Sequence, residues 1–253
     1  MSNIKVAIIN ASTTLTDAEV QAAVPALQAQ VRDDFAPAWG IDADLSFVGT
    51  GGQPAPGAWW LAIMDNSDQQ DALGYHETTN EGLPMGKVFA ASDQQDGLNW
   101  TVTASHELLE MLADPEIDLT VFAQPSDTSG RLYAYEVCDP CEADQYGYEI
   151  SGTLVSDFVF PAFFESFRKQ GTPFDRQGQI KSPFELLPGG YIGIFDVTAG
   201  TGWSQQTAQK RSGRGFRSPR ARVGSRRERR RVARDAWRKS TVQFGHKSGK
   251  KAA

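Results

Sequence analysis

The stretch "TASHELLEMLADP", residues 103–115, is the segment from which the fold can be inferred. An α-helix advances ~100° per residue, so with His106 at 0°, Glu110 falls near ~40° and Asp114 near ~80°. Glu107 falls near ~100° on the same scale. One His and three carboxylates therefore share one arc of the helix. Most of the remaining circumference is apolar, which predicts a helix buried in the domain.

A buried helix with this acidic stripe suits a divalent cation. Burying an unpaired ionised carboxylate is costly, so such groups are normally paired or bound to a metal. His106 and Glu110 are four residues apart, so their side chains can reach one ion from adjacent turns. A helix that only forms structural salt bridges is the alternative interpretation.

The segment "HELLE", residues 106–110, resembles the His-Glu-x-x-His motif of the zincin metallopeptidases, in a His-Glu-x-x-Glu form. This resemblance implies that His106 and Glu110 bind Zn²⁺ and that Glu107 activates a metal-bound water. It also implies a peptide or protein substrate. Because Glu110 replaces a His, the site is richer in oxygen, and Mn²⁺ or Ca²⁺ competes better with Zn²⁺. A site that has lost catalysis is a further alternative.

Zincins usually take a third ligand downstream of the helix, and residues 133–149, "YAYEVCDPCEADQYGYE", are the obvious source. Alternation of apolar residues puts Glu136 on the opposite face of a strand. Asp139 precedes Pro140 at a natural turn position, from which its side chain can point inward. We expect Glu136 or Asp139 to be the third ligand, with Glu116 as a shorter-range option. A solvated acidic loop and a separate calcium site are the alternatives.

His76, in "GYHETT", is the only other His of the acidic body. It can be a fourth metal ligand, a residue that contacts and orients the ligands, or a hydrogen-bond donor to the transition state. We count His76 with Glu107 as a candidate catalytic residue, although a lone strand His is more often structural. An oxyanion donor could also come from one of four tyrosines, which otherwise pack in the core: Tyr133, Tyr135, Tyr146 and Tyr148.

On the N-terminal side of the helix, the pattern alternates between strands and helices. Thr16 or Asp17 can cap a first long helix, which Pro25 kinks or splits. Two short extended pieces flank "NEGLPMG", residues 80–86. Other strands are predicted at 4–10, 43–49 and 58–65.

This order of elements is similar to that of the zincin N-terminal subdomain. In that fold the second helix carries the metal motif and an edge strand holds the peptide substrate. By that resemblance, the edge strand is expected near "GYHE", residues 74–77, or "GKVFAAS", residues 86–92.

The C-terminal half has a different pattern. Short strands follow Pro115, then a short helix in 161–170 and a last strand in 189–197. From about Ser204 the chain is rich in Gln, Ser, Gly and Arg, which predicts a disordered or weakly helical segment.

The fold class is therefore α+β: a mixed β-sheet with two main helices, a β- and loop-rich C-terminal part, and a basic tail. The predicted domains are a zincin-like metal-binding domain (1–203, divided at 115/116) and a flexible tail (204–253).

Charge separates the tail from the body. Residues 210–251 carry 17 Lys or Arg against two acidic residues, whereas residues 1–209 carry 8 against 29, so the net charge of −6 divides into +15 and −21. A basic tail of this kind favours binding to nucleic acid or to an acidic protein surface. It can equally fold back on the acidic body or remain solvated.

The number of cysteines and the hydropathy of the chain limit the classes of protein to which it can belong. Cys138 and Cys141 exclude a disulfide framework and leave a local disulfide or two thiols in a turn. No stretch approaches ~20 uncharged apolar residues, so a membrane span is not expected. Residues 1–10 lack a signal-peptide cleavage site. We expect a cytoplasmic protein, or one exported without an N-terminal signal peptide; the oligomeric state is left open.

Together these features predict a metal-dependent hydrolase, in particular a zinc metallopeptidase. The first alternative is a non-enzymatic binding or assembly protein that keeps a structural ion on the same scaffold and attaches through its basic tail. The second is a metal-dependent nuclease, because carboxylate-rich sites also suit phosphoryl chemistry.

Overall fold

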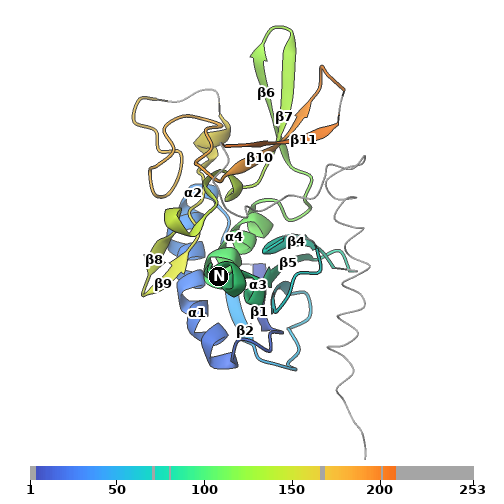
Figure 1. Cartoon of the computed structure of the whole chain (residues 1–253), viewed down its shortest axis with the longest axis vertical. Helices are drawn as coiled ribbons and strands as arrows, with labels where there is room; N and C mark the ends of the chain where they lie inside the picture. Colours follow the sequence, from blue (N-terminus) through green and yellow to red (C-terminus); the bar gives the residue numbers. More distant parts are fainter. Residues whose placement is uncertain (1–3, 70–71, 80, 166–168, 201, 209–253) are drawn as a thin grey trace, which may run out of the picture.

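The computed structural model describes residues 4–69, 72–79, 81–165, 169–200 and 202–208. It has a mixed α/β architecture with three sheets, which agrees with the predicted α+β class. Figure 1 shows the motif helix near the centre, with the first long helix on one side of it and the edge of the largest sheet on the other.

The largest sheet contains strands β1 (Ile4–Asn10), β2 (Ala43–Val48), β3 (Trp59–Met64), β4 (Gly74–Thr78) and β5 (Pro84–Phe89). Their order across the sheet is β2-β1-β3-β5-β4. Strands β2, β1, β3 and β5 pair in parallel with their neighbours in this order, whereas β4 runs antiparallel to β5 and lies at one edge. All five strands were expected from the sequence. Of the two segments considered for an edge strand, "GYHE" lies at one edge of the sheet, whereas "GKVFAAS" begins in the internal strand β5.

Alternation along β1 divides the sheet into two faces. Val6 and Ile8 lie in the main core with the buried side chains of both long helices, so these helices cover the same face. Ala7 and Ile9 form a smaller cluster on the opposite face. The main core also includes side chains from the C-terminal half, so one continuous core joins both parts of the chain.

The first long helix, α1 (Asp17–Ala29), begins at Thr16, as one of the two predicted caps. The Thr16 hydroxyl accepts from the Glu19 N–H while the Glu19 carboxylate accepts from the Thr16 N–H, a capping box. The helix runs through Pro25 and continues as a π-helical segment (Gln30–Phe35) and the short α2 (Ala36–Trp39). Gly40 ends it in the left-handed conformation, with φ of 71°.

The motif helix is α4 (Trp100–Ala113), within one residue of the bounds that the sequence pattern predicts, about Asn99 to Asp114. Asp144 holds its start, because its carboxylate accepts from the backbone N–H and the side-chain amide of Asn99. The Asp114 carboxylate holds its end by accepting from the N–H groups of Asp118 and Leu119. A second short helix, α3 (Ala90–Asp96), precedes α4 and was not expected.

The C-terminal half forms a second sheet of four strands in the order β11-β10-β7-β6, which lies at the top of Figure 1. A separate hairpin packs against α4 and α1 through its second strand. The strands of these two sheets are β6 (Thr120–Ser126), β7 (Ser129–Ala134), β8 (Tyr148–Ile150), β9 (Thr153–Val155), β10 (Tyr191–Asp196) and β11 (Trp203–Thr207).

Two expectations for this half need correction. The prediction of a disordered or weakly helical chain from Ser204 is wrong up to Thr207, because β11 pairs antiparallel with β10. The predicted domain boundary at 203/204 therefore falls inside a strand. The short helix expected in 161–170 is a single 3-10 turn (Pro161–Phe164). The basic segment 210–251 lies outside the described residues.

Within the ranges given above, no helix combines the length and apolar character needed to cross a membrane.

Candidate metal centre

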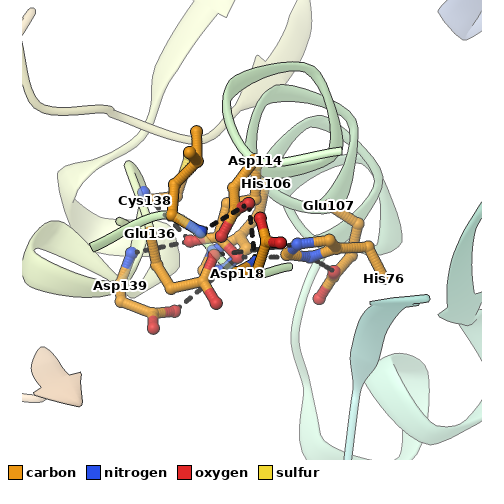
Figure 2. Close-up of polar contacts among 10 residues, drawn as sticks. His76, His106, Glu107, Asp114, Asp118, Glu136, Cys138 and Asp139 are labelled. Atoms are coloured by element: carbon orange, nitrogen blue, oxygen red, sulfur yellow. Dashed lines mark hydrogen bonds and ion pairs between the residues drawn. The ribbon is translucent and has the colours of Figure 1, made fainter. Parts of the chain in front are cut away.

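Three elements bring six chemically active side chains together (Figure 2). The set comprises His76 from β4, three residues of α4 and two residues of the loop after β7. All six are buried, with exposures from 0% for His76 to 9% for His106. The candidate ligands and the two candidate catalytic residues predicted from the sequence thus lie in one place: His76, His106, Glu107, Glu110, Glu136 and Asp139.

The first ligand group is His106, Glu110 and Asp139. Nε2 of His106 lies 3.3 Å from Oε2 of Glu110 and 3.3 Å from Oδ1 of Asp139. Two ligands bound to one zinc ion at ~2.0–2.1 Å with tetrahedral geometry lie ~3.3–3.4 Å apart. These two spacings therefore suit a zinc-sized ion.

Glu110 uses its two oxygens differently. Oε1 accepts from the backbone N–H groups of Cys138 (3.1 Å) and Asp139 (3.2 Å). These bonds fix the carboxylate and join α4 to the loop that carries Asp139. Oε2 points toward the imidazoles, 3.3 Å from Nε2 of His106 and 3.8 Å from Nδ1 of His76. The sequence pattern could place Glu110 on the ligand stripe but could not reveal this backbone anchor.

A second group consists of His76, Glu110 and Glu136. Nε2 of His76 lies 3.7 Å from Oε2 of Glu136. Figure 2 shows His76 and Asp139 on opposite sides of the cluster, with Glu136 between them. Both third-ligand candidates therefore reach the centre, Asp139 beside His106 and Glu136 beside His76.

Glu107 lies next to both groups but, among the described residues, belongs to neither. Its Oε2 is 3.5 Å from Nδ1 of His76. Its side chain lies against Gly74 of β4, where an added Cβ would approach Cγ and Oε1 of Glu107 to 2.8 Å. The close packing of α4 on β4 at this glycine sets the position of the carboxylate.

The cluster carries more acid than base. Four carboxylates and two imidazoles give the six-residue set a charge of −4 with both imidazoles neutral and −2 with both protonated. Burial alone would lower the pKa of His106, but Glu110 and Asp139 outweigh burial and raise it well above its ordinary value. Burial and the charge of Glu110 raise the pKa of Asp139. The cluster thus favours bound positive charge, as protons or as a cation.

Tyr191 is a site residue that the sequence analysis missed. It begins β10 and forms a hydrogen bond with Asp139. Burial, followed by the charge of Asp139, raises the pKa of Tyr191 well above its ordinary value. Gly190 allows this approach, because a Cβ at Gly190 would overlap the carbonyl of Pro140. The adjacent Gly189 and Gly190 are the one feature of the sequence here that indicates close backbone packing.

The four tyrosines considered from the sequence have other contacts. Tyr133 packs on Phe184, and Tyr135 packs on Trp39 and Phe164. The hydroxyl of Tyr146 donates to the carbonyl of Pro188, and that of Tyr148 to Asp34. These contacts hold the C-terminal half together.

In the described part of the chain, four other residues considered from the sequence belong to neither ligand group: Asp114, Glu116, Cys138 and Cys141. Asp114 caps the end of α4. Glu116 follows in the next turn and belongs to neither group of the described part. Cys138 and Cys141 are buried free thiols; Cys138 precedes a 3-10 turn (Asp139–Cys141) and Cys141 is its last residue. Burial is the main cause that raises the pKa of both thiols.

Comparison of the chain with protein-family models, with curated proteins and with solved structures finds no match.

Proposed function

We propose that this chain is a metal-dependent hydrolase, in particular a zinc metallopeptidase of zincin-like fold. The observation that carries the proposal is the first ligand group: His106, Glu110 and Asp139 present ligand atoms at zinc spacing. Glu107 lies one residue from His106 on the same helix, so a carboxylate that can accept a proton is beside the ligands.

Each side chain has a role in this proposal. His106, Glu110 and Asp139 would hold the ion, which when bound would supply Lewis-acid chemistry. Glu107 would act as the general base that takes a proton from the attacking water and would return that proton to the leaving amine. Nδ1 of His76, 3.5 Å from Oε2 of Glu107, orients this carboxylate. The edge position of β4 and the order of β1, α1, β2 to β5 and α4 support a zincin-like arrangement.

The proposal is tested by measuring metal content and peptide hydrolysis for the wild type and two variants. Glu107→Gln should keep the metal and lose ~10²–10⁴-fold in the rate of hydrolysis of a mixed peptide library, because the general base is removed. Glu142→Gln is the matched control. Burial raises the pKa of Glu142 to about 8, so an amide resembles its protonated form, and Glu142 lies outside both ligand groups.

A specific observation favours a second candidate, a binding or assembly protein with a structural ion. The ligands are nearly fully buried, as in closed structural metal sites. All five residues of β4 are also buried, whereas strand addition by a peptide needs an accessible edge. Stoichiometric metal together with equal, background hydrolysis by the wild type and Glu107→Gln would favour this candidate. Attachment through the basic tail remains a prediction, because that segment is outside the described residues.

A further inference from the structure

The geometry points to a second divalent-cation site, formed by His76 and Glu136 and sharing Glu110 with the first. This inference rests on the proposed function, because it extends the same centre from one ion to two. Its ligands come from three elements: β4, α4 and the loop after β7.

The two ligand groups have only Glu110 in common. Figure 2 shows Asp139 on one side of the cluster and His76, which comes from β4, on the other. Nε2 of His106 lies 3.3 Å from Oδ1 of Asp139. Each side supplies one imidazole and one carboxylate of its own. A single ion held by the first group would leave His76 and Glu136 without a metal.

Distances within the second group suit coordination better than direct hydrogen bonds. Nε2 of His76 is 3.7 Å from Oε2 of Glu136, and Nδ1 is 3.8 Å from Oε2 of Glu110. Hydrogen bonds between such atoms are ~2.7–3.2 Å long. Only one nitrogen of His76 can bind the ion, so only one of these two distances separates two ligands of it. Bonds of ~2.3–2.6 Å at angles of ~90–109° place neighbouring ligands ~3.3–4.2 Å apart, a range that includes either distance.

The imidazole of His76 is well placed to be a ligand. Both of its ring nitrogens face carboxylates, Nδ1 toward Glu107 and Glu110 and Nε2 toward Glu136. One nitrogen can therefore bind the ion while the other donates to a carboxylate, the arrangement that orients most metal-binding histidines. His76 is fully buried, so its ring orientation is fixed by packing.

Charge gives an independent reason for two ions. With neutral imidazoles the six-residue set carries −4, which one divalent ion halves and two divalent ions cancel. Two-metal hydrolytic sites hold their ions ~3.5–4 Å apart, and residues that share one carboxylate, as these two groups share Glu110, would be suited to hold such a pair.

The test is the metal stoichiometry of the full chain, measured with Mn²⁺ by calorimetry and by electron paramagnetic resonance. The wild type should bind two Mn²⁺ and give a spin-coupled spectrum. His76→Ala and, separately, the isosteric Glu136→Gln should each bind one Mn²⁺ and give an uncoupled six-line spectrum. Glu142→Gln should keep two coupled ions.

Outcomes separate this inference from the proposed function. One uncoupled ion in the wild type, retained by His76→Ala and by Glu136→Gln, overturns the second site and leaves the proposed function standing. One ion that is lost with either variant also overturns it, because His76 and Glu136 would then serve a single ion. No bound ion overturns both. The wild-type spectrum decides even where a variant fails to fold.

Discussion

At the scale of single residues, Glu110 stands where the His-Glu-x-x-His motif has its second His. The contacts of Glu110 give a reason for a carboxylate at this position. Its Oε1 accepts two backbone N–H groups, from Cys138 and Asp139, while its Oε2 faces the ligands. A His in the same place could bind an ion through one nitrogen, but its other nitrogen would carry a hydrogen. That N–H would point toward two further N–H donors.

We therefore predict that Glu110→His, which completes the His-Glu-x-x-His pattern, lowers the free energy of unfolding of the protein. Two buried N–H groups lose their acceptor, at ~1–3 kcal/mol each in the free energy of unfolding. Urea denaturation and zinc titration of the variant measure both effects. Tighter zinc binding with unchanged stability would contradict the role assigned to the Glu110 carboxylate.

Most of the centre was predictable at this scale, because His106, Glu107 and Glu110 share a helical period. The roles of Glu136 and Asp139 could not be separated, because the loop after β7 brings both to the cluster by long-range packing. Tyr191 was missed for the same reason: its contact with Asp139 joins residues 52 positions apart, and no local period records it.

At the scale of elements, α4 and β4 form the centre by packing closely at Gly74. A Cβ there would meet Thr103 at 2.7 Å and Glu107 at 2.8 Å. Gly74→Ala should therefore displace the Glu107 carboxylate and lower hydrolysis by ~10²-fold, the usual cost of a misplacement of ~1 Å. Metal content should stay close to that of the wild type.

Gly130→Ala is the control for this prediction. Its Cβ would also come within 3 Å of neighbours, but these are side-chain atoms of Phe122 and Val197, which are 58% and 47% exposed and can move. Equal losses of hydrolysis in the two glycine variants would show that packing at Gly74 has no special relation to Glu107.

Elements were predicted where side-chain burial follows a period, as in β1 and α4, and missed where it does not. α3 is short and mostly polar on its exposed side, so its pattern is that of a loop. β11 has mainly exposed polar side chains, and its backbone bonds to β10 define it as a strand. Backbone pairing of this kind leaves little trace in hydropathy.

At the scale of the whole molecule, a buried pair of carboxyl groups, Asp157 and Asp175, links stability to pH. Phe158 and Gln177 donate N–H groups to Oδ1 of Asp157, at 2.8 and 3.2 Å. Burial, the charge of Asp175 and a hydrogen bond between the two carboxyls raise the pKa of Asp157 to about 8. In the unfolded chain the pKa of an Asp is about 3.9.

Since the folded pKa is raised, the contribution of Asp157 to stability is fully present below pH ~4 and is lost as the pH rises toward ~8. Asp157→Asn, whose amide resembles the neutral carboxyl, should remove this loss. The free energy of unfolding of the variant relative to wild type should rise between pH 5 and pH 8, by at most about 1.4 kcal/mol per pH unit.

Denaturation curves at several pH values test this prediction, with Asp127→Asn as a control. Asp127 is exposed in the turn between β6 and β7, so its substitution removes one surface carboxylate without changing the buried pair. A constant difference between Asp157→Asn and wild type across this range would contradict the assignment of a neutral Asp157 in the folded protein.

The central claim is that His106, Glu110 and Asp139 bind a metal ion through nitrogen and oxygen. X-ray absorption at the zinc edge, on the zinc-loaded full chain after desalting, tests it most directly. We predict nitrogen and oxygen neighbours at ~2.0–2.2 Å with imidazole scattering. Sulfur at ~2.3 Å would instead indicate Cys138 or Cys141. Sulfur ligation, or the absence of retained zinc, would contradict the account.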